Sequence, residues 1–218
     1  MGQLRIGLIG DLHGFPEPAL EWISRTEPDF CLQAGDYWSY AVEWPVPVYW
    51  IFGNHEHGPT IRAIIDGSYE FHPNNRWLKG GVEIIDGVSV MALPGLPQAR
   101  SGPGPAHYPP NVYEECMNHE GEDIDIFLSH GCGFEFGCMA HDANTHEVEY
   151  INFEEPPITD LIRFVRPLLA VSGHNHRFAK EEHEGIKCIR LGHRSNSMFH
   201  MIEVPPEGEG AEESYEEG

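Results

Sequence analysis

The sequence predicts a layered α/β fold, and three observations support this. Short apolar runs of strand length alternate along the chain with amphipathic segments of helix length. Five of these runs end directly in loops that carry Asp, His or Asn, and in such folds ligand sites lie beyond the carboxyl ends of the strands. The chain has 218 residues, of which 40% are hydrophobic, which suffices for one domain with a sizeable core.

Strands and helices are expected to alternate in the first third of the chain. The segment 16–25 predicts a helix, because Pro16 and Pro18 suit its first turn and apolar side chains recur along it. A short helix is predicted over 60–66, with Thr60 as its N-cap. Buried strands are predicted over three apolar runs: 4–10, 29–34 and 46–52.

A β-hairpin is expected to follow these units. Asp86-Gly87 is a strong signal for a two-residue turn, and the apolar runs 82–85 and 88–93 on either side supply its strands. A later helix is predicted over 158–165. Further strands are predicted over four more apolar runs: 123–129, 168–172, 186–191 and 198–204.

Three segments are expected to lack regular structure. The Pro/Gly-rich segment 94–111 is a long loop of the kind that often covers an active site. The segment 131–157 is predicted to be irregular. Residues 205–218 are acidic, rich in Gly and almost free of apolar side chains, which predicts a disordered tail. The folded domain is therefore expected to span residues 1–204.

Charge and composition exclude several classes of protein. Lys and Arg number 13 against 35 Asp and Glu, and the resulting net charge of −22 excludes a non-specific nucleic-acid binder, because it repels phosphate backbones. An anionic substrate would need a local cation, for which a metal is an obvious candidate. No apolar run approaches the roughly 20 residues that span a bilayer, and the N-terminus lacks the pattern of a signal peptide, so we expect a cytoplasmic protein without membrane contact. Five cysteines are few for a disulfide scaffold, and reduced thiols are expected.

The polar residues at the strand ends have the chemistry of metal ligands. Carboxylate, amide and imidazole groups together suit Mn²⁺, Fe²⁺, Zn²⁺, Co²⁺ or Ni²⁺. No cysteine ends a strand, which argues against a thiolate site, and the histidines argue against an all-oxygen calcium site. Because the carboxyl ends of neighbouring strands lie together, eight residues are expected to converge: Asp11, His13, Asp36, Asn54, His55, His130, His174 and His176.

Five short motifs carry a resemblance to a known family. In chain order they are Gly10-Asp11-Leu12-His13, Gly35-Asp36, Gly53-Asn54-His55-Glu56, Ser129-His130-Gly131 and Gly173-His174-Asn175-His176. Their order and content resemble the calcineurin-like metallophosphoesterases. The resemblance implies a four-layer αββα sandwich of two mixed β-sheets flanked by helices, with a dinuclear metal site at the carboxyl ends of the strands.

The resemblance also implies a role for each motif residue. The first metal would be bound by Asp11, His13 and His176. The second would be bound by Asn54, His130 and His174. Asp36 would bridge the two metals, with Mn²⁺ favoured, and His55 would act near the leaving-group oxygen without binding a metal. The implied activity is hydrolysis of small phosphate mono- or diesters by in-line attack of a metal-bridging hydroxide.

The sequence departs from many of these relatives beside the second motif. They carry another Asp three residues after the first, which orients the histidine of the third motif, whereas this chain has Ser39. Ser39 or an acid from elsewhere is therefore expected to orient His55. The arginines of the Ser/Thr protein phosphatase branch are absent from the corresponding places, so the chain is more similar to the compact bacterial and archaeal phosphoesterases.

Other residues and functions stay open at this stage. Tyr37 and Trp38 adjoin Asp36 and could line a wall for a base or sugar. Arg100 in the segment 94–111 and His141 in the segment 131–157 could contact substrate. One alternative function is a metal-stabilised interaction module with little catalysis, and another is a phosphoprotein phosphatase.

Overall fold

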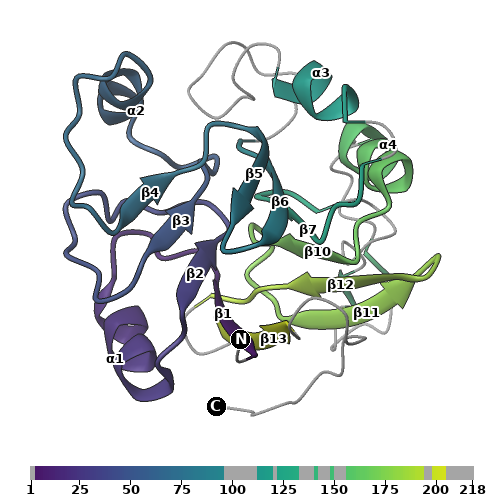
Figure 1. Cartoon of the computed structure of the whole chain (residues 1–218), viewed down its shortest axis with the longest axis horizontal. Helices are drawn as coiled ribbons and strands as arrows, with labels where there is room; N and C mark the ends of the chain where they lie inside the picture. Colours follow the sequence, from purple (N-terminus) through teal and green to yellow (C-terminus); the bar gives the residue numbers. More distant parts are fainter. Residues whose placement is uncertain are drawn as a thin grey trace.

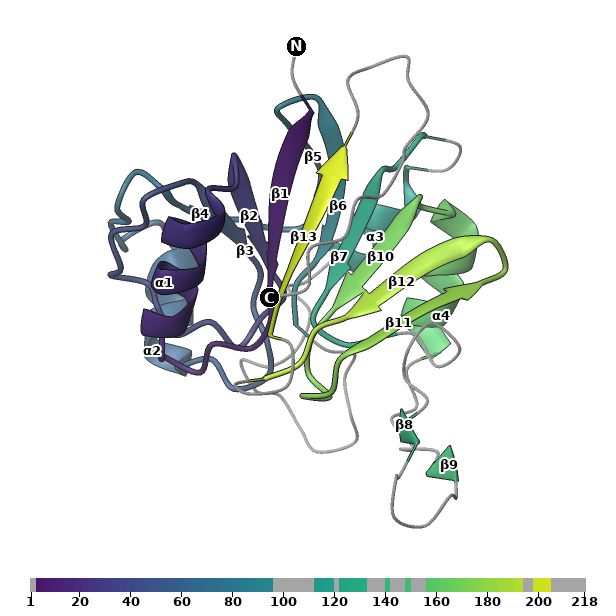
Figure 2. The same cartoon turned by 90° about the horizontal axis from the view of Figure 1, so that it is seen from below.

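Two mixed β-sheets lie face to face, and helices cover the outer side of each sheet (Figure 2). The computed structural model describes residues 3–95, 112–119, 122–132, 140–141, 148–149, 156–193 and 198–204. The predicted four-layer αββα sandwich is confirmed.

The first sheet has five strands in the order β13-β1-β2-β3-β4 (Figure 1). β1 to β4 run parallel, and β13 pairs with β1 in the antiparallel sense. Helices α1 (Glu17–Thr26) and α2 (Gly58–Ile65) cover its outer face. The strands span β1 (Leu4–Ile9), β2 (Phe30–Gln33), β3 (Val48–Trp50), β4 (Asn75–Trp77) and β13 (Phe199–Val204).

The second sheet has six strands in the order β11-β12-β10-β7-β6-β5. The inner four run parallel, whereas the edge strands β11 and β5 are antiparallel to their neighbours. Helices α3 (Val112–Met117) and α4 (Pro156–Val165) cover its outer face. The strands span β5 (Gly81–Ile85), β6 (Val88–Leu93), β7 (Ile126–Ser129), β10 (Leu169–Ser172), β11 (Ala179–His183) and β12 (Ile186–Arg190), and a separate pair comprises β8 (Ala140–His141) and β9 (Val148–Glu149).

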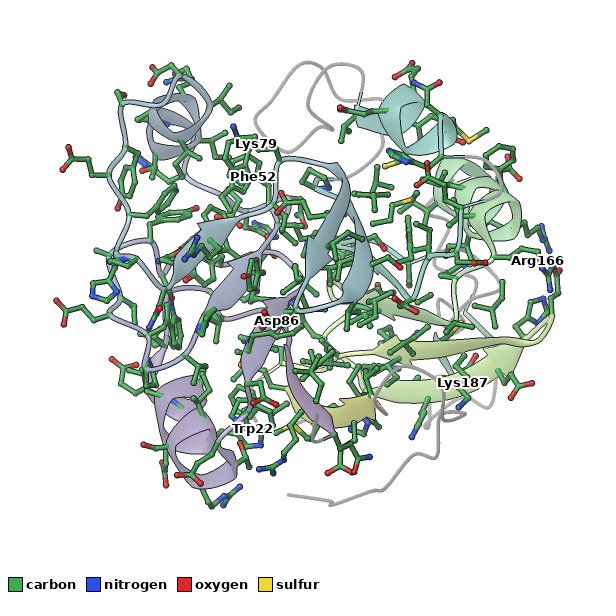
Figure 3. The ribbon with its side chains drawn as sticks, in the orientation of Figure 1. Trp22, Phe52, Lys79, Asp86, Arg166 and Lys187 are labelled. Atoms are coloured by element: carbon green, nitrogen blue, oxygen red, sulfur yellow. The ribbon has the colours of Figure 1, made fainter. Side chains whose placement is uncertain are left out.

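Alternation along the strands separates the apolar core into a central layer and two outer layers. Ile6 and Leu8 of β1 point into the central layer between the sheets, where Leu128 of β7 also lies. Trp22 lies on the side of α1 that faces the first sheet (Figure 3). Its ring covers Gly7 of β1, where an added Cβ would come within 2.9 Å of it, so this contact requires glycine.

Most predicted elements are present, with boundaries shifted by a few residues. The hairpin turn has positive φ at both Asp86 (48°) and Gly87 (90°), as its sequence predicts. The N-cap predicted for α2 is wrong. The helix begins earlier, at Gly58, after His57, and Thr60 lies inside it with its hydroxyl 2.9 Å from His57 Nδ1.

Several segments differ from expectation or were not predicted. The strands β4 and β11 and the helix α3 were not predicted, and β8 and β9 interrupt the segment expected to be irregular. The tail 205–218 and nearly all of the loop 94–111 lie outside the described residues. In the part of the chain that the structure covers, no helix has the length and apolar character needed to cross a membrane.

Candidate metal centre

The five motif loops meet where parallel strands from both sheets end. Asp11, Asp36 and Asn54 follow β1, β2 and β3 of the first sheet, and His130 and His174 follow β7 and β10 of the second. Hydrogen bonds between the loops fix this arrangement, since the His13 N–H donates to the Asp36 carbonyl (2.8 Å). Donor groups from both sheets therefore face one small volume.

One group of ligand atoms belongs to Asp11, His13, Asp36 and His176. These four atoms all lie within 4.8 Å of one another. His176 Nε2 is 3.1 Å from Asp11 Oδ2 and also 3.1 Å from His13 Nε2. Imidazole and carboxylate groups that aim at a common point in this way can hold a divalent ion.

A second group forms around Asn54. Its Oδ1 lies 2.8 Å from His130 Nε2 and 2.9 Å from His174 Nδ1. His130 Nδ1 is 2.7 Å from the Ala34 carbonyl, which can only accept, so Nδ1 carries the hydrogen and the neutral ring presents a lone pair at Nε2. Two lone pairs then face each other, at His130 Nε2 and Asn54 Oδ1, and a shared cation would satisfy both.

Asp36 lies between the two groups. Its Oδ2 is 3.7 Å from His13 Nε2 in one group and 3.5 Å from His130 Nε2 in the other. Its Oδ1 accepts a hydrogen bond from the His55 backbone N–H (2.8 Å). Oδ2 is buried and has no hydrogen-bond partner within the described part of the chain. An unpaired buried carboxylate oxygen is costly, so two bound cations that share Oδ2 fit the residues present.

Burial and hydrogen bonds shift the pKa values of three of these candidate ligands in different directions. Burial alone would raise the pKa of Asp11, but the hydrogen bond with His176 and the electrostatic interaction with the nearby His130 outweigh it and lower the pKa. Burial, with a smaller contribution from His130, lowers the pKa of His174 to about 4, so this ring is neutral at pH 7. The hydrogen bond to Asp11 raises the pKa of His176. A proton on Nε2 of this ring would have to leave before that atom could bind a metal.

The backbone around these groups is conformationally unusual. Four of the candidate ligand residues have left-handed φ values, namely His13 (47°), Asp36 (50°), His174 (68°) and His176 (55°). Such values cost energy for residues other than glycine and cluster at functional sites. Gly53 is required for close approach, because a Cβ there would overlap the carboxylate of Asp36.

His55 lies on the rim of the pocket rather than in either group. Its side chain is exposed, and its ring centroid is 5.7 Å from that of His13. Among the described residues its ring has no hydrogen-bond partner. Of the two alternatives expected to orient it, Ser39 is excluded, because it is buried and donates its hydroxyl to the Tyr37 carbonyl (3.1 Å).

The four residues predicted to contact substrate have three different outcomes. Tyr37 is 0% exposed, stacks on Trp50 at 4.6 Å and accepts a hydrogen bond from Trp44, so it is a core side chain and cannot line a substrate wall. Trp38 is 46% exposed and lies edge-on to His13, with ring centroids 6.1 Å apart. Arg100 and the side chain of His141 lie outside the described residues.

The cysteines are only partly as expected. Cys31, Cys116 and Cys188 are free thiols, as the composition predicts. Cys132 is disulfide-bonded, which corrects the expectation that every thiol is reduced.

Sequence reasoning missed two residues of this region. Glu56 is buried, and its Oε1 accepts hydrogen bonds from the backbone N–H of Tyr37 (2.8 Å) and of Gly53 (3.2 Å). His193 lies 2.6 Å from the Asp11 carbonyl through Nδ1. The available signal for His193 was that it directly follows a predicted strand, as the motif residues do.

Comparisons with known proteins identify the family of the chain and agree with its fold. A family model described as calcineurin-like phosphoesterase matches residues 4–178. The protein TT1561 of Thermus thermophilus has a similar structure at 14% identity and TM-score 0.61, covering 93% of this chain and 94% of its own. A dimetal phosphatase from Danio rerio is similar at 12% identity and TM-score 0.53, with 94% of each chain covered. A putative 5′-nucleotidase from Staphylococcus aureus is similar at 13% identity and TM-score 0.58, covering 98% of this chain and 53% of its own. No curated protein matches the sequence.

Proposed function

Because this chain belongs to the calcineurin-like phosphoesterases, we propose that it is a dinuclear metal-dependent hydrolase of small phosphate mono- or diesters. One observation carries the proposal. The unpartnered Oδ2 of Asp36 lies between two groups of ligand atoms, 3.7 Å from His13 Nε2 on one side and 3.5 Å from His130 Nε2 on the other. This is the arrangement expected of a bridging carboxylate.

Each side of the pocket would hold one divalent ion, with Mn²⁺ favoured. Asp36 would contribute to both sites. The remaining ligands would be Asp11, His13 and His176 for the first ion and Asn54, His130 and His174 for the second. When bound, such a pair of ions supplies the Lewis acidity that polarises the phosphoryl oxygens and makes a water nucleophilic near neutral pH.

His55 is proposed as the proton donor to the departing oxygen. It is exposed at the rim, and its backbone N–H is tied to Asp36 Oδ1 (2.8 Å), which keeps the residue beside the pocket while its ring stays outside both ligand groups. A histidine can give up a proton near pH 7, which suits protonation of an alkoxide leaving group. The proton would move from the His55 ring to the ester oxygen as the bond to phosphorus breaks.

Trp38 is proposed to contact the organic part of the substrate. Its exposed indole stands beside His13, and left-handed backbone (φ 49°) holds it there. An aromatic face at this place would favour esters of planar groups over esters of small alkyl groups. The putative 5′-nucleotidase and the dimetal phosphatase among the similar structures support a phosphate ester as the substrate class.

The test is hydrolysis of p-nitrophenyl phosphate and its bis-ester. The chelator-treated protein would be assayed alone and after addition of Mn²⁺, Co²⁺, Ni²⁺, Zn²⁺ or Fe²⁺. We expect turnover only with added metal, its loss in Asp36→Ala, and its retention in Asp66→Ala, a matched change of an exposed acid at the end of α2. If the protein binds metal but shows no turnover with any of these ions, the proposed hydrolase activity is refuted and an interaction module is favoured.

A further inference from the structure

We propose that His193 is a positioning residue that holds the three ligands of the first metal in place. The inference rests on the proposed function, because those ligands are Asp11, His13 and His176. His193 follows β12 and belongs to none of the five motifs. What singles it out is that one imidazole touches all three of these residues.

The contacts of His193 are specific in geometry. Its Nδ1 lies 2.6 Å from the carbonyl oxygen of Asp11. Its ring centroid is 4.8 Å from that of His13, with the rings nearly perpendicular at 87°. It is 4.7 Å from that of His176, with the rings tilted by 35°. The His193 ring therefore packs against the rings of both His13 and His176, while its Nδ1 forms a hydrogen bond with the backbone of Asp11.

The hydrogen bond also fixes the state of the His193 ring. A carbonyl oxygen can only accept, so Nδ1 carries the hydrogen and is committed to the Asp11 backbone. This prevents the ring from rotating away from His13 and His176. Residues that do not bind a metal themselves but hold its ligands in position commonly contribute strongly to metal affinity.

The segment that carries His193 is itself anchored to both sheets. The Leu191 N–H donates to the carbonyl of Ser172 at the end of β10 (2.8 Å). On the other side the backbone of Gly192 packs against Gly10, where an added Cβ would overlap the Gly192 carbonyl. His193 is thus held between the strand that precedes Asp11 and the strand that precedes His174 and His176.

Three variants separate the hydrogen bond from the ring packing. His193→Ala removes both contacts. His193→Asn keeps an N–H donor near the place of Nδ1 but removes the ring, and His193→Phe keeps a ring but removes the donor. His119→Asn is the matched control, because it removes an imidazole that is paired with Glu122 beyond the end of α3.

The experiment is Mn²⁺ titration of the chelator-treated, full-length protein by calorimetry. In His193→Ala we expect the affinity of one of the two sites to fall about 10–100-fold, while the other site changes by less than about threefold. His193→Asn and His193→Phe should each recover part of this loss, and His119→Asn should bind as the wild type does. Circular dichroism of each metal-free variant checks that it is folded.

Each result decides the inference. Unchanged Mn²⁺ binding in His193→Ala would overturn it, as would an equal loss at both sites together with a lower melting temperature of the metal-free protein. If the wild type binds no metal, both this inference and the proposed function fail. If the wild type binds two ions without turnover, only the proposed function fails.

Discussion

Replacement of Glu56 by Ala should destabilise the protein by removing an acceptor shared by two loops. The Oε1 atom accepts from the N–H of Tyr37 in the loop after β2 and from the N–H of Gly53 in the loop after β3. The hydroxyl of Tyr40 donates to Oε2. Each buried group left without a partner costs about 1–3 kcal/mol. For the two N–H groups alone we therefore expect a loss of about 2–6 kcal/mol in the free energy of unfolding.

Glu56→Gln should be far milder, because the amide keeps the essential acceptor. Its oxygen can still accept from Tyr37 and Gly53, and its N–H can donate to the oxygen of Tyr40. We expect a change of about 1 kcal/mol or less at pH 5. The contrast with Glu56→Ala would show that the hydrogen bonds, rather than the charge, hold the two loops together.

The stability contributed by Glu56 should fall as the pH rises. Burial raises the pKa of Glu56 above its usual range, and the hydrogen bonds from Tyr40, Tyr37 and Gly53 only partly oppose this rise. The Glu56 carboxyl group therefore binds its proton more tightly in the folded state than in the unfolded state. Protonation of Glu56 contributes its full stabilisation below the pKa of the unfolded state, about 4.3. This stabilisation is lost as the pH rises through the pKa of Glu56 in the folded state. Glu56→Gln has no such proton to lose.

The assay is urea unfolding of metal-free wild type and Glu56→Gln at several pH values from 4 to 8. Other titrating groups are common to both proteins and cancel in the difference. We expect the Gln variant to gain stability relative to the wild type as the pH rises, whereas a control variant at the exposed Glu83 should show no such trend. A difference that stays constant with pH, or a Glu56→Ala variant as stable as the wild type, would refute the reasoning.

Four further outcomes are expected. Asp36→Asn keeps the acceptor for the His55 N–H. It should nevertheless weaken Mn²⁺ binding at both sites by more than about 100-fold in calorimetry, because loss of a residue that only supports a ligand already costs about 10–100-fold. His55→Asn should lower kcat by about 10²–10⁴ for alkyl esters and much less for p-nitrophenyl esters; an equal loss for both would contradict its role as proton donor. Trp38→Ala should raise KM for aryl esters by about 2–10-fold and leave methyl phosphate hydrolysis and Mn²⁺ affinity unchanged. Chelation should lower the melting temperature, because each ion present at 100 times its Kd adds about 2.7 kcal/mol, and an unchanged temperature would argue against resident metals.

Strand-end chemistry was predictable from the sequence because it depends on local pattern. A buried apolar run followed at once by Gly and a polar residue identifies both the strand and the loop after it, as at Gly10-Asp11 and Gly173-His174. The parallel arrangement then brings such loops together without any knowledge of side-chain contacts. The predicted residues, far apart along the chain, accordingly lie together in the structure, where four of them could hold a metal ion.

The missed elements have no local pattern to show them. The strand β4 is only three residues long, Asn75–Trp77, and has no apolar run. It is fixed by distant groups: the side chain of Asn75 accepts a hydrogen bond from Trp50 (2.6 Å) and donates to the carbonyl of Tyr40 (2.9 Å). The edge strand β11 is largely charged and is specified by its pairing with β12. Long-range contacts of this kind cannot be inferred from one sequence.

The prediction that Tyr37 could line a substrate wall is wrong, and the local backbone shows why this could not be foreseen. Alternation of side chains holds in extended backbone, but Tyr37 lies between Asp36 (φ 50°) and Trp38 (φ 49°). The strand pattern of alternation therefore does not apply here, and the structure has Tyr37 in the core and Trp38 exposed. Asp36, one of these left-handed residues, has its Oδ2 3.7 Å from His13 Nε2 and 3.5 Å from His130 Nε2. The sequence pattern does not show this local backbone, on which the proposed bridging position of Asp36 and the exposed Trp38 both depend.

The distribution of ligands across the sheets links metal binding to the sandwich itself. In the proposed assignment the first sheet supplies Asp11 and His13 to one ion, and the second sheet supplies His176. The other ion would likewise join Asn54 of the first sheet to His130 of the second. Each ion would then cross-link layers that otherwise meet through the central apolar core. Because bound metal and core packing would resist the same separation of the sheets, a variant with weaker metal affinity should lose stability in the presence of metal, even where its metal-free stability is unchanged.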